Sequence, residues 1–230
     1  MIHSAFLYLL TVVSLEIGID IGAFFALFSK SKTAPLQTAA RIWARFALAF
    51  SGIKVSVSGL ENIPRERGLI FASNHQSFVD TVLTLTSIPT NFRVLAAKKY
   101  FRVPILGRGW RKAGYILVDQ DSPSSFFHIL KKTIEIIKAG ESVLIFPEGT
   151  RSKNGKLGEF KHASLLPALR SGAPIIPIAI SGSFDILPRG TWIIYPRPVK
   201  FSFGKPIYIR SEAEYDKKLA EIREAIARML

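Results

Sequence analysis

Cysteine is absent from the 230-residue sequence, and so are several of the commonest catalytic and nucleotide-binding motifs. Without cysteine the chain has no disulfide framework, no cysteine-ligated zinc or iron–sulfur centre and no thiol nucleophile. The missing motifs are GxGxxG, GxxxxGKS/T, HExxH and GxSxG. Dinucleotide binding, P-loop phosphate binding, zinc proteolysis and the nucleophile elbow of α/β-hydrolases therefore lack their usual sequence support.

Acidic residues are scarce: the chain has 31 Lys and Arg against 17 Asp and Glu, and its formal net charge is +14. Yet 48% of the residues are hydrophobic, which is too many for a disordered basic tail and enough to bury the core of one folded domain. A chain of this charge needs an anionic partner, either a nucleic acid or a lipid surface. The high hydrophobicity favours the lipid surface.

Residues 5–28 form an apolar run that is long enough to cross a bilayer as a helix. Glu16 and Asp20 interrupt the run and share one helix face, and an ionised carboxylate near the centre of a bilayer is costly. A helix that lies shallowly in one leaflet, or pairs with a neighbour, fits this pattern better than a plain span. The run is also a poor signal peptide, because no Lys or Arg precedes it.

A second apolar helix is expected from Pro35 to about Phe50. Residues 1–51 are therefore interpreted as a two-helix membrane-docking segment, and residues 52–230 as a separate domain. The alternative is that both helices belong to the core of a soluble protein. Juxtamembrane cations favour the cytoplasmic side. The cations next to the two apolar helices are Lys30, Lys32, Arg41 and Arg45. Their presence predicts association with the cytoplasmic face of the inner (plasma) membrane.

Beyond residue 52, short apolar segments alternate with amphipathic ones, which is typical of an α/β fold. The pattern predicts a mixed, mostly parallel sheet flanked by helices. Strands are expected at residues 53–58, 68–72, 92–96, 115–118, 142–146, 174–181, 191–195 and 199–209. Helices are expected at residues 78–87, 126–138, 162–170 and 211–230.

The first candidate site follows the expected strand at 68–72, where the sequence reads SNHQSFVD from Ser73 to Asp80. On a regular helix His75 and Asp80 would point about 140° apart. They meet only if His75 lies in the turn and Asp80 in the first helical turn. A carboxylate bonded to one imidazole nitrogen leaves the other nitrogen as a base. The alternative is that Ser77 and Asp80 merely form a helix capping box.

The second candidate site follows the expected strand at 142–146 and reads FPEGTRS. Arg151 suits bidentate phosphate contacts, and Gly149 allows backbone N–H groups to approach an anion. Lys161 follows closely. The alternative is an ordinary turn with a surface salt bridge.

Between these two sites the stretch 93–112 has seven cations, no acid and interleaved aromatic residues. Such a stretch could bind nucleic acid, with the aromatic rings as stacking platforms. It could equally bind anionic lipid headgroups, or form a solvated basic surface.

The pattern Asn74-His75-x-x-x-x-Asp80, followed about 70 residues later by FPEGTRS, resembles the signature of the PlsC-like glycerolipid acyltransferases. The best-known members of that family are 1-acyl-sn-glycerol-3-phosphate acyltransferases. The basic block at 99–120 and the apolar strand at 173–178 are also similar to the family. The resemblance covers about residues 50–210.

The resemblance implies transfer of an acyl chain from acyl-CoA or acyl-carrier protein to the hydroxyl of 1-acyl-glycerol-3-phosphate. His75 would be the general base and Asp80 would orient it, with a hydrophobic groove for the acyl tails. Membrane lipids are implied as partners, while no nucleic acid, cofactor or metal is. The residues implied in binding the acceptor are Glu148, Gly149, Thr150 and Arg151, with Lys99 and Lys161 as further phosphate contacts.

One position departs from the family pattern. The family's second block commonly ends in Ile-Asp-Arg, whose Arg helps to hold the acceptor phosphate, whereas this chain has Gln120, which carries no charge. Another lysolipid acceptor, such as a lyso-ornithine lipid, is therefore an alternative. A non-catalytic basic protein that binds membranes or nucleic acid is an alternative of a different class.

Overall fold

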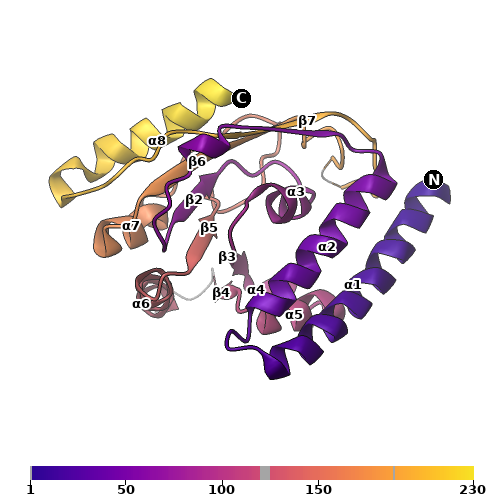
Figure 1. Ribbon diagram of the computed structural model, residues 1–230. Helices are drawn as coiled ribbons and strands as arrows, with labels where there is room; N and C mark the ends of the chain where they lie inside the picture. The colour runs from indigo at the N-terminus through magenta and orange to yellow at the C-terminus, as the bar shows by residue number, and fades with distance from the viewer. Residues whose placement is uncertain (1, 120–124, 189) are drawn as a thin grey trace.

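The structure, a computed structural model, describes residues 2–119, 125–188 and 190–230. These residues form a seven-stranded sheet with the order β1-β7-β6-β2-β5-β3-β4, flanked by helices (Figure 1). The strands are β1 (Val55–Ser58), β2 (Ile70–Ser73), β3 (Phe92–Ala97), β4 (Ile116–Val118), β5 (Ser142–Ile145), β6 (Ile175–Ser181) and β7 (Val199–Phe203).

Neighbouring strands among those described pair in parallel, apart from the antiparallel pair of β6 and β7. The predicted fold class, a mixed and mostly parallel sheet, is therefore confirmed. The central strands β2 and β5 are buried along their whole length, as expected for strands covered by helices on both faces.

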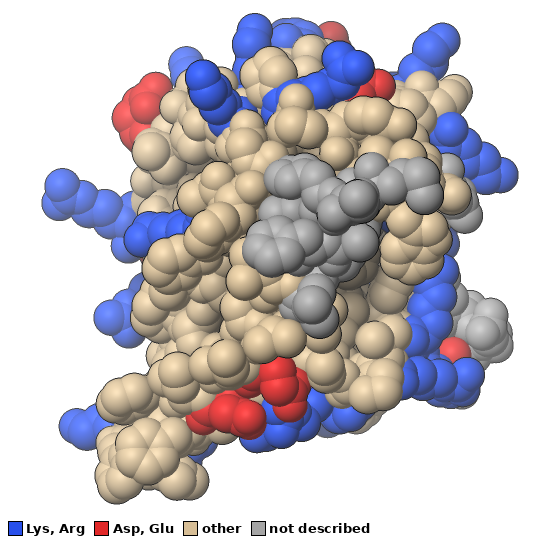
Figure 2. Space-filling model, turned by 90° about the vertical axis from the view of Figure 1, so that its right-hand side faces the viewer, with Lys and Arg blue, Asp and Glu red and all other residues tan. Residues whose placement is uncertain are grey.

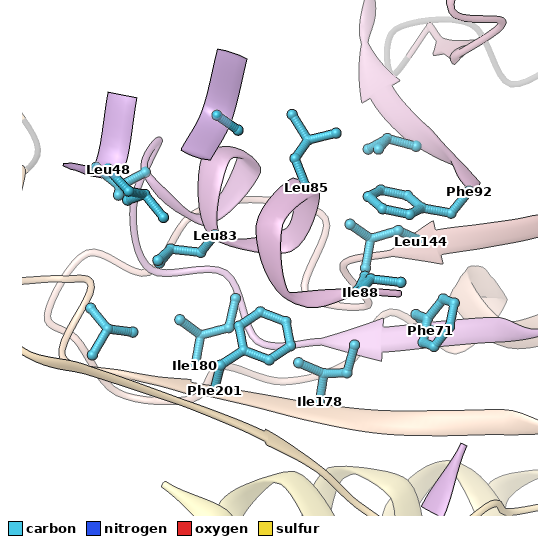
Figure 3. Close-up of a cluster of buried hydrophobic side chains, with 14 of the residues drawn as sticks. Leu48, Phe71, Leu83, Leu85, Ile88, Phe92, Leu144, Ile178, Ile180 and Phe201 are labelled. Atoms are coloured by element: carbon cyan, nitrogen blue, oxygen red, sulfur yellow. The ribbon is translucent and has the colours of Figure 1, made fainter. Parts of the chain in front are cut away.

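Side chains of successive strand residues fill two cores on opposite faces of the sheet. Phe71 and Leu144 point into one core together with Leu83 and Phe92 (Figure 3). This core lies under α2 (Ala34–Ser51) and α3 (Asp80–Ser87). The opposite core lies under α6 (Ser125–Lys138), α7 (Leu166–Ser171) and α8 (Tyr215–Met229).

The two N-terminal helices, α1 (Ile2–Phe28) and α2, lie side by side (Figure 1). Within α1, Leu10–Phe28 is long and apolar enough to cross a membrane by length and composition. Its two acids have a partner, because Arg108 forms ion pairs with Glu16 and, at 3.1 Å, with Asp20. The α2 helix also contributes Ala44 and Leu48 to the first core.

Arg108 lies in α5 (Pro104–Lys112), which follows the short helix α4 (Lys98–Phe101). Neither helix was predicted from the sequence. Cations of the acid-free stretch 93–112 have acidic partners from elsewhere in the chain. Arg93 bonds to Glu141 at 2.6 Å and Lys98 to Asp119 at 2.7 Å. The stretch is therefore not a uniformly unpaired basic surface.

One strand prediction was wrong, and another was confirmed only in its first half. Residues 191–195 form a loop, in which the N–H of Tyr195 donates to the carbonyl of Ile186 at 2.9 Å instead of to a sheet partner. The strand predicted at 199–209 ends at Phe203, because Gly204 and Pro206 interrupt the ladder, and only Ile207 forms a further bridge, to Ile175. The predicted helices at 162–170 and 211–230 begin as 3₁₀ turns, at His162–Leu165 and Glu212–Glu214.

Candidate active site

The turn between β2 and α3 is fixed to the sheet by the side chain of Asn74. Its amide nitrogen donates to the carbonyl of Ile180 at 2.9 Å, and its oxygen accepts the N–H of Ile180 at 2.8 Å. Asn74 is fully buried, so these two bonds satisfy polar groups that would otherwise be costly. The side chain thereby continues the pairing of β2 with β6 by one step and sets the direction in which the turn leaves the sheet.

His75 and Asp80 are brought together by this turn. His75 Nδ1 lies 2.8 Å from Asp80 Oδ2, and Asp80 is the first residue of α3. The same oxygen accepts the N–H groups of Gln76 at 2.7 Å and Ser77 at 2.9 Å. Asp80 therefore caps the turn and orients the imidazole at once, so the capping and catalytic interpretations are compatible.

The imidazole of His75 is held from one side by an aromatic ring. It stacks on Phe146, with the ring centroids 4.1 Å apart and the planes 21° from parallel. Its side chain is 19% exposed, whereas that of Asp80 is fully buried. With Nδ1 bonded to the carboxylate, Nε2 is the nitrogen left to exchange a proton with a bound molecule.

The loop after β5 clamps the main chain of His75 at both ends. The carboxylate of Glu148 accepts the N–H of His75 at 2.8 Å, and the N–H of Ser152 donates to the carbonyl of His75 at 2.8 Å. The second carboxylate oxygen of Glu148 accepts the N–H of Gly158 at 2.7 Å. The two sequence motifs therefore form one hydrogen-bonded unit.

Glu148 is buried beside the cleft. It is 7% exposed, and the residues that line the neighbouring cleft in the described part of the chain do not include it. Burial raises the pKa of its carboxyl, against the opposing effect of the two N–H groups that it accepts. Glu148 thus supports the main chain of His75 from behind the cleft, and its role in acceptor binding stays a prediction.

Six of the eight candidate residues surround one cleft of about 390 Å³. Asp80 and Glu148 lie behind it. The cleft is charged at one end and apolar along the wall formed by β3, β4, β5 and α6, which includes Val94, Val118, Ile129 and Ile145. An amphipathic ligand with an anionic head fits such a lining. The six candidates are His75, Lys99, Gly149, Thr150, Arg151 and Lys161.

Gly149 is required at its position by both conformation and space. Its φ of 69° lies in the left-handed region, and a Cβ atom placed there would lie 2.6 Å from Cε of Lys161. The absence of a side chain lets Lys161 cross the turn beside Arg151.

Sequence reasoning missed Asn74, Ser152 and Phe146 as supports of the site. Asn74 is part of the NHxxxxD pattern, which was the available signal, but its partner Ile180 is 106 residues away in the chain. Gln120, the position that departs from the family pattern, lies outside the described residues. Among the described residues, no group of three or more His, Asp or Glu is placed to hold a metal ion.

One sequence-family model covers the segment that contains both motifs. The sequence model of the acyltransferase family matches residues 54–181, which include the site from Asn74 to Lys161. The chain belongs to the acyltransferase family. The resemblance seen in the sequence motifs is thereby confirmed.

Individual relatives of this acyltransferase-family chain carry a more specific name. A chloroplastic 1-acyl-sn-glycerol-3-phosphate acyltransferase of Brassica napus is 34% identical over 80% of this chain and 54% of its own length. The enzyme of the same name from Pseudomonas aeruginosa is 31% identical, over 79% and 71%. The chain spans about half the length of the chloroplastic relatives from Brassica napus and Arabidopsis thaliana.

A solved structure matches this acyltransferase-family chain along nearly its whole length. The crystal structure of the 1-acyl-sn-glycerophosphate acyltransferase PlsC from Thermotoga maritima superposes with a TM-score of 0.84 and 25% sequence identity. The match covers 99% of this chain and 95% of that one. It therefore includes the α1–α2 pair and α8, which lie outside residues 54–181.

Proposed function

We propose that this acyltransferase moves a fatty acyl chain from acyl-CoA or acyl-carrier protein to the free hydroxyl of 1-acyl-glycerol-3-phosphate, giving phosphatidate. Support comes from the names of its relatives and from the composition of the cleft. The observation that carries the proposal is the pair His75–Asp80, which opens onto a cleft with cations at one end and an apolar wall.

The proposed chemistry begins with His75. Its Nε2 takes the proton of the acceptor hydroxyl as that oxygen attacks the thioester carbonyl, while Asp80 stabilises the imidazolium that forms. The tetrahedral intermediate then expels the thiolate of the donor, which takes the proton from His75. The substrate oxygen is the nucleophile, so no acyl-enzyme forms, and the reaction uses no cofactor or metal. The N–H groups of Thr150 and Arg151 are proposed to stabilise the oxyanion.

The charged end of the cleft is proposed to hold the acceptor phosphate. Arg151 can bind phosphate oxygens through two parallel N–H groups, and Lys99 and Lys161 line the same cleft. The apolar wall is proposed to take an acyl chain, since such a surface favours hydrocarbon over water by about 25 cal/mol per Å².

The acyltransferase is further proposed to dock on one leaflet, at the cytoplasmic face of the membrane. Figure 2 shows a broad, largely uncharged face on the side of α1 and α2, with Lys and Arg gathered mainly towards its margins. An apolar face with cationic margins suits an anionic lipid surface. The exposed apolar residues of the two helices include Val13, Ile17, Ile21, Phe24, Phe25, Phe28, Ile42, Phe46 and Phe50.

A panel of acceptors tests the substrate assignment. Purified protein is given a radiolabelled acyl donor with lysophosphatidate, lyso-ornithine lipid and other lysophospholipids at equal concentration. Highest kcat/KM with lysophosphatidate is the expected result. Preference for another lysolipid would refute the assignment of lysophosphatidate as acceptor but leave the assignment of acyl transfer intact. Salt-sensitive nucleic-acid binding, without turnover of any acceptor, would refute the proposal that the protein is an enzyme.

A further inference from the structure

The connection between β6 and β7, residues 182–198, is much longer than an antiparallel pair requires. Two to five residues suffice for a hairpin. Ile186 is fully buried, and Leu187 and Ile194 pack against the core that also contains Leu48 and Ile53. The described body of this loop is therefore held firmly by the domain.

Trp192 lies in this loop and is largely exposed to solvent. Its exposed fraction is 78%, and that of the neighbouring Tyr195 is 43%. The other two tryptophans, Trp43 and Trp110, are partly buried against the core. An exposed indole on a well-packed loop indicates a binding surface, because burial of such a ring contributes strongly to affinity.

The loop adjoins the C-terminal end of α2. A Cβ atom on Gly52 would lie 3.7 Å from Pro196, and the N–H of Val199 donates to the carbonyl of Lys54 at 2.9 Å. The last turns of α2 expose Phe46 and Phe50. The loop thus lies next to the end of α2 that carries these two exposed rings.

The charge around Trp192 suits one kind of occupant. Lys54 and Arg197 are exposed beside the loop, and the one acid of residues 182–198 is Asp185. Trp and Tyr prefer the headgroup level of a bilayer, and Lys or Arg near an anionic surface adds attraction. The neighbouring apolar end of α2 and the excess of cations therefore both favour a lipid surface.

We propose that the β6–β7 loop is a second membrane contact, in which Trp192 inserts into the headgroup region of an anionic phospholipid bilayer. This inference rests on the proposed function, since the acceptor of that reaction is a membrane lipid. Two neighbouring contacts, α1–α2 and the loop, restrict the tilt of the cleft relative to the bilayer more than the helices alone.

The loop is also joined to the candidate active site. The hydroxyl of Ser77 donates to the carbonyl of Leu187 at 3.2 Å, and the N–H of Ser77 donates to Asp80. Asp80 in turn bonds to His75. The loop that carries the proposed lipid contact is thus connected with the His75 turn through Ser77.

Fluorescence quenching by brominated lipids tests this proposal on the full-length chain. Vesicles of phosphatidylglycerol and phosphatidylcholine, with and without brominated acyl chains, are added to wild type and to Trp192→Phe. The emission of Trp192, obtained by subtraction, should shift to shorter wavelength and be quenched. In a sedimentation assay Trp192→Ala should lower the vesicle partition coefficient about tenfold, while Leu60→Ala, at the opposite end of β1, should leave it unchanged.

Activity separates this proposal from the proposed function. Trp192→Ala should raise the apparent KM for lysophosphatidate presented in vesicles and keep wild-type turnover of a short-chain, monomeric lysophosphatidate. If wild type acylates its acceptor but Trp192 is not quenched, or if the partition coefficients of wild type and Trp192→Ala agree, the second contact is refuted and the acyltransferase assignment stands. Absence of turnover on every acceptor would refute that assignment instead.

Discussion

The carboxylate of Glu148 accepts the main-chain N–H of His75 at 2.8 Å, across 73 residues of sequence. This bond places the FPEGTRS loop directly behind the candidate base. A second bond, from Ser152 to the carbonyl of His75, closes the same clamp. The backbone position of His75 is therefore set by the loop that also supplies Arg151 to the cleft, so the base and the proposed phosphate contact are fixed relative to each other.

Replacement of Glu148 by Gln should disrupt this clamp. Gln offers one acceptor oxygen to two N–H groups and turns an NH₂ towards the other, which costs about 1–3 kcal/mol of unfolding free energy. A displaced His75 should lower kcat by roughly one to two orders of magnitude, with little change in KM for the acceptor. Chemical denaturation and steady-state kinetics measure the two effects.

The matched control is Glu159→Gln in the same loop. The side chain of Glu159 is 88% exposed and pairs with Arg223 at 3.1 Å, so its loss should change stability by less than about 0.5 kcal/mol. A rise in KM for the acceptor at unchanged kcat and stability in Glu148→Gln would instead support the acceptor-binding role that the sequence suggested for Glu148.

The raised pKa of Glu148 makes the free energy of unfolding depend on pH. The folded state holds the proton more tightly than the unfolded state, because burial disfavours the charged carboxylate. The contribution of Glu148 to the free energy of unfolding therefore falls as pH rises from the unfolded pKa of about 4.3 through the raised folded pKa. Chemical denaturation at several pH values in this window should show the free energy of unfolding of wild type falling with pH. The fall should be shallower in Glu148→Gln, and equal slopes would contradict the buried placement of Glu148.

Alanine substitutions of Gly149 and Gly172 distinguish the effect of backbone strain from the effect of steric crowding. Both have φ near 70°, but a Cβ at Gly149 meets Lys161 whereas one at Gly172 meets nothing within 4 Å. Alanine at either position should cost about 1–2 kcal/mol of stability. Only Gly149→Ala should also raise KM for the acceptor, by displacing Lys161. An equal effect of the two variants on KM would show that Lys161 has no part in binding.

Arg108 joins the apolar helix α1 to the α/β domain through Glu16 and Asp20. Arg108→Ala should release α1 and quicken tryptic cleavage at Lys30 and Lys32 by roughly two- to fivefold, the range expected for partly exposed ion pairs. The exchanged pair Arg108→Glu with Glu16→Arg should restore resistance. Cleavage at the wild-type rate in Arg108→Ala would mean that apolar packing alone holds the helix.

The sequence contained enough to predict the sheet and the meeting of His75 with Asp80. The strands β2, β5 and β6 are continuous apolar runs, and the five-residue spacing allowed contact only across a turn and a helix start. The direction in which the side chain of Glu148 points could not be predicted from sequence patterns. It depends on the N–H groups of His75 and Gly158, which reach it only through tertiary folding.

Local sequence was misleading where packing decided the outcome. Helix α5 was missed because Gly107 and Gly109 lower helix propensity, yet a Cβ on Gly109 would lie 2.7 Å from Ile19 of α1. The glycine allows the two helices to approach. Conversely, Ile193 and Tyr195 resemble strand residues, but they belong to the loop that carries Trp192.

Acyl transfer by purified wild type beside His75→Ala is the most direct test of the account. The protein is supplied with acyl-CoA and lysophosphatidate, and release of the free thiol is followed together with formation of phosphatidate. Loss of the general base should lower kcat by about 10²–10⁴-fold, while circular dichroism and the unfolding transition remain those of a folded protein. Wild-type turnover by folded His75→Ala would contradict the proposed mechanism at its centre.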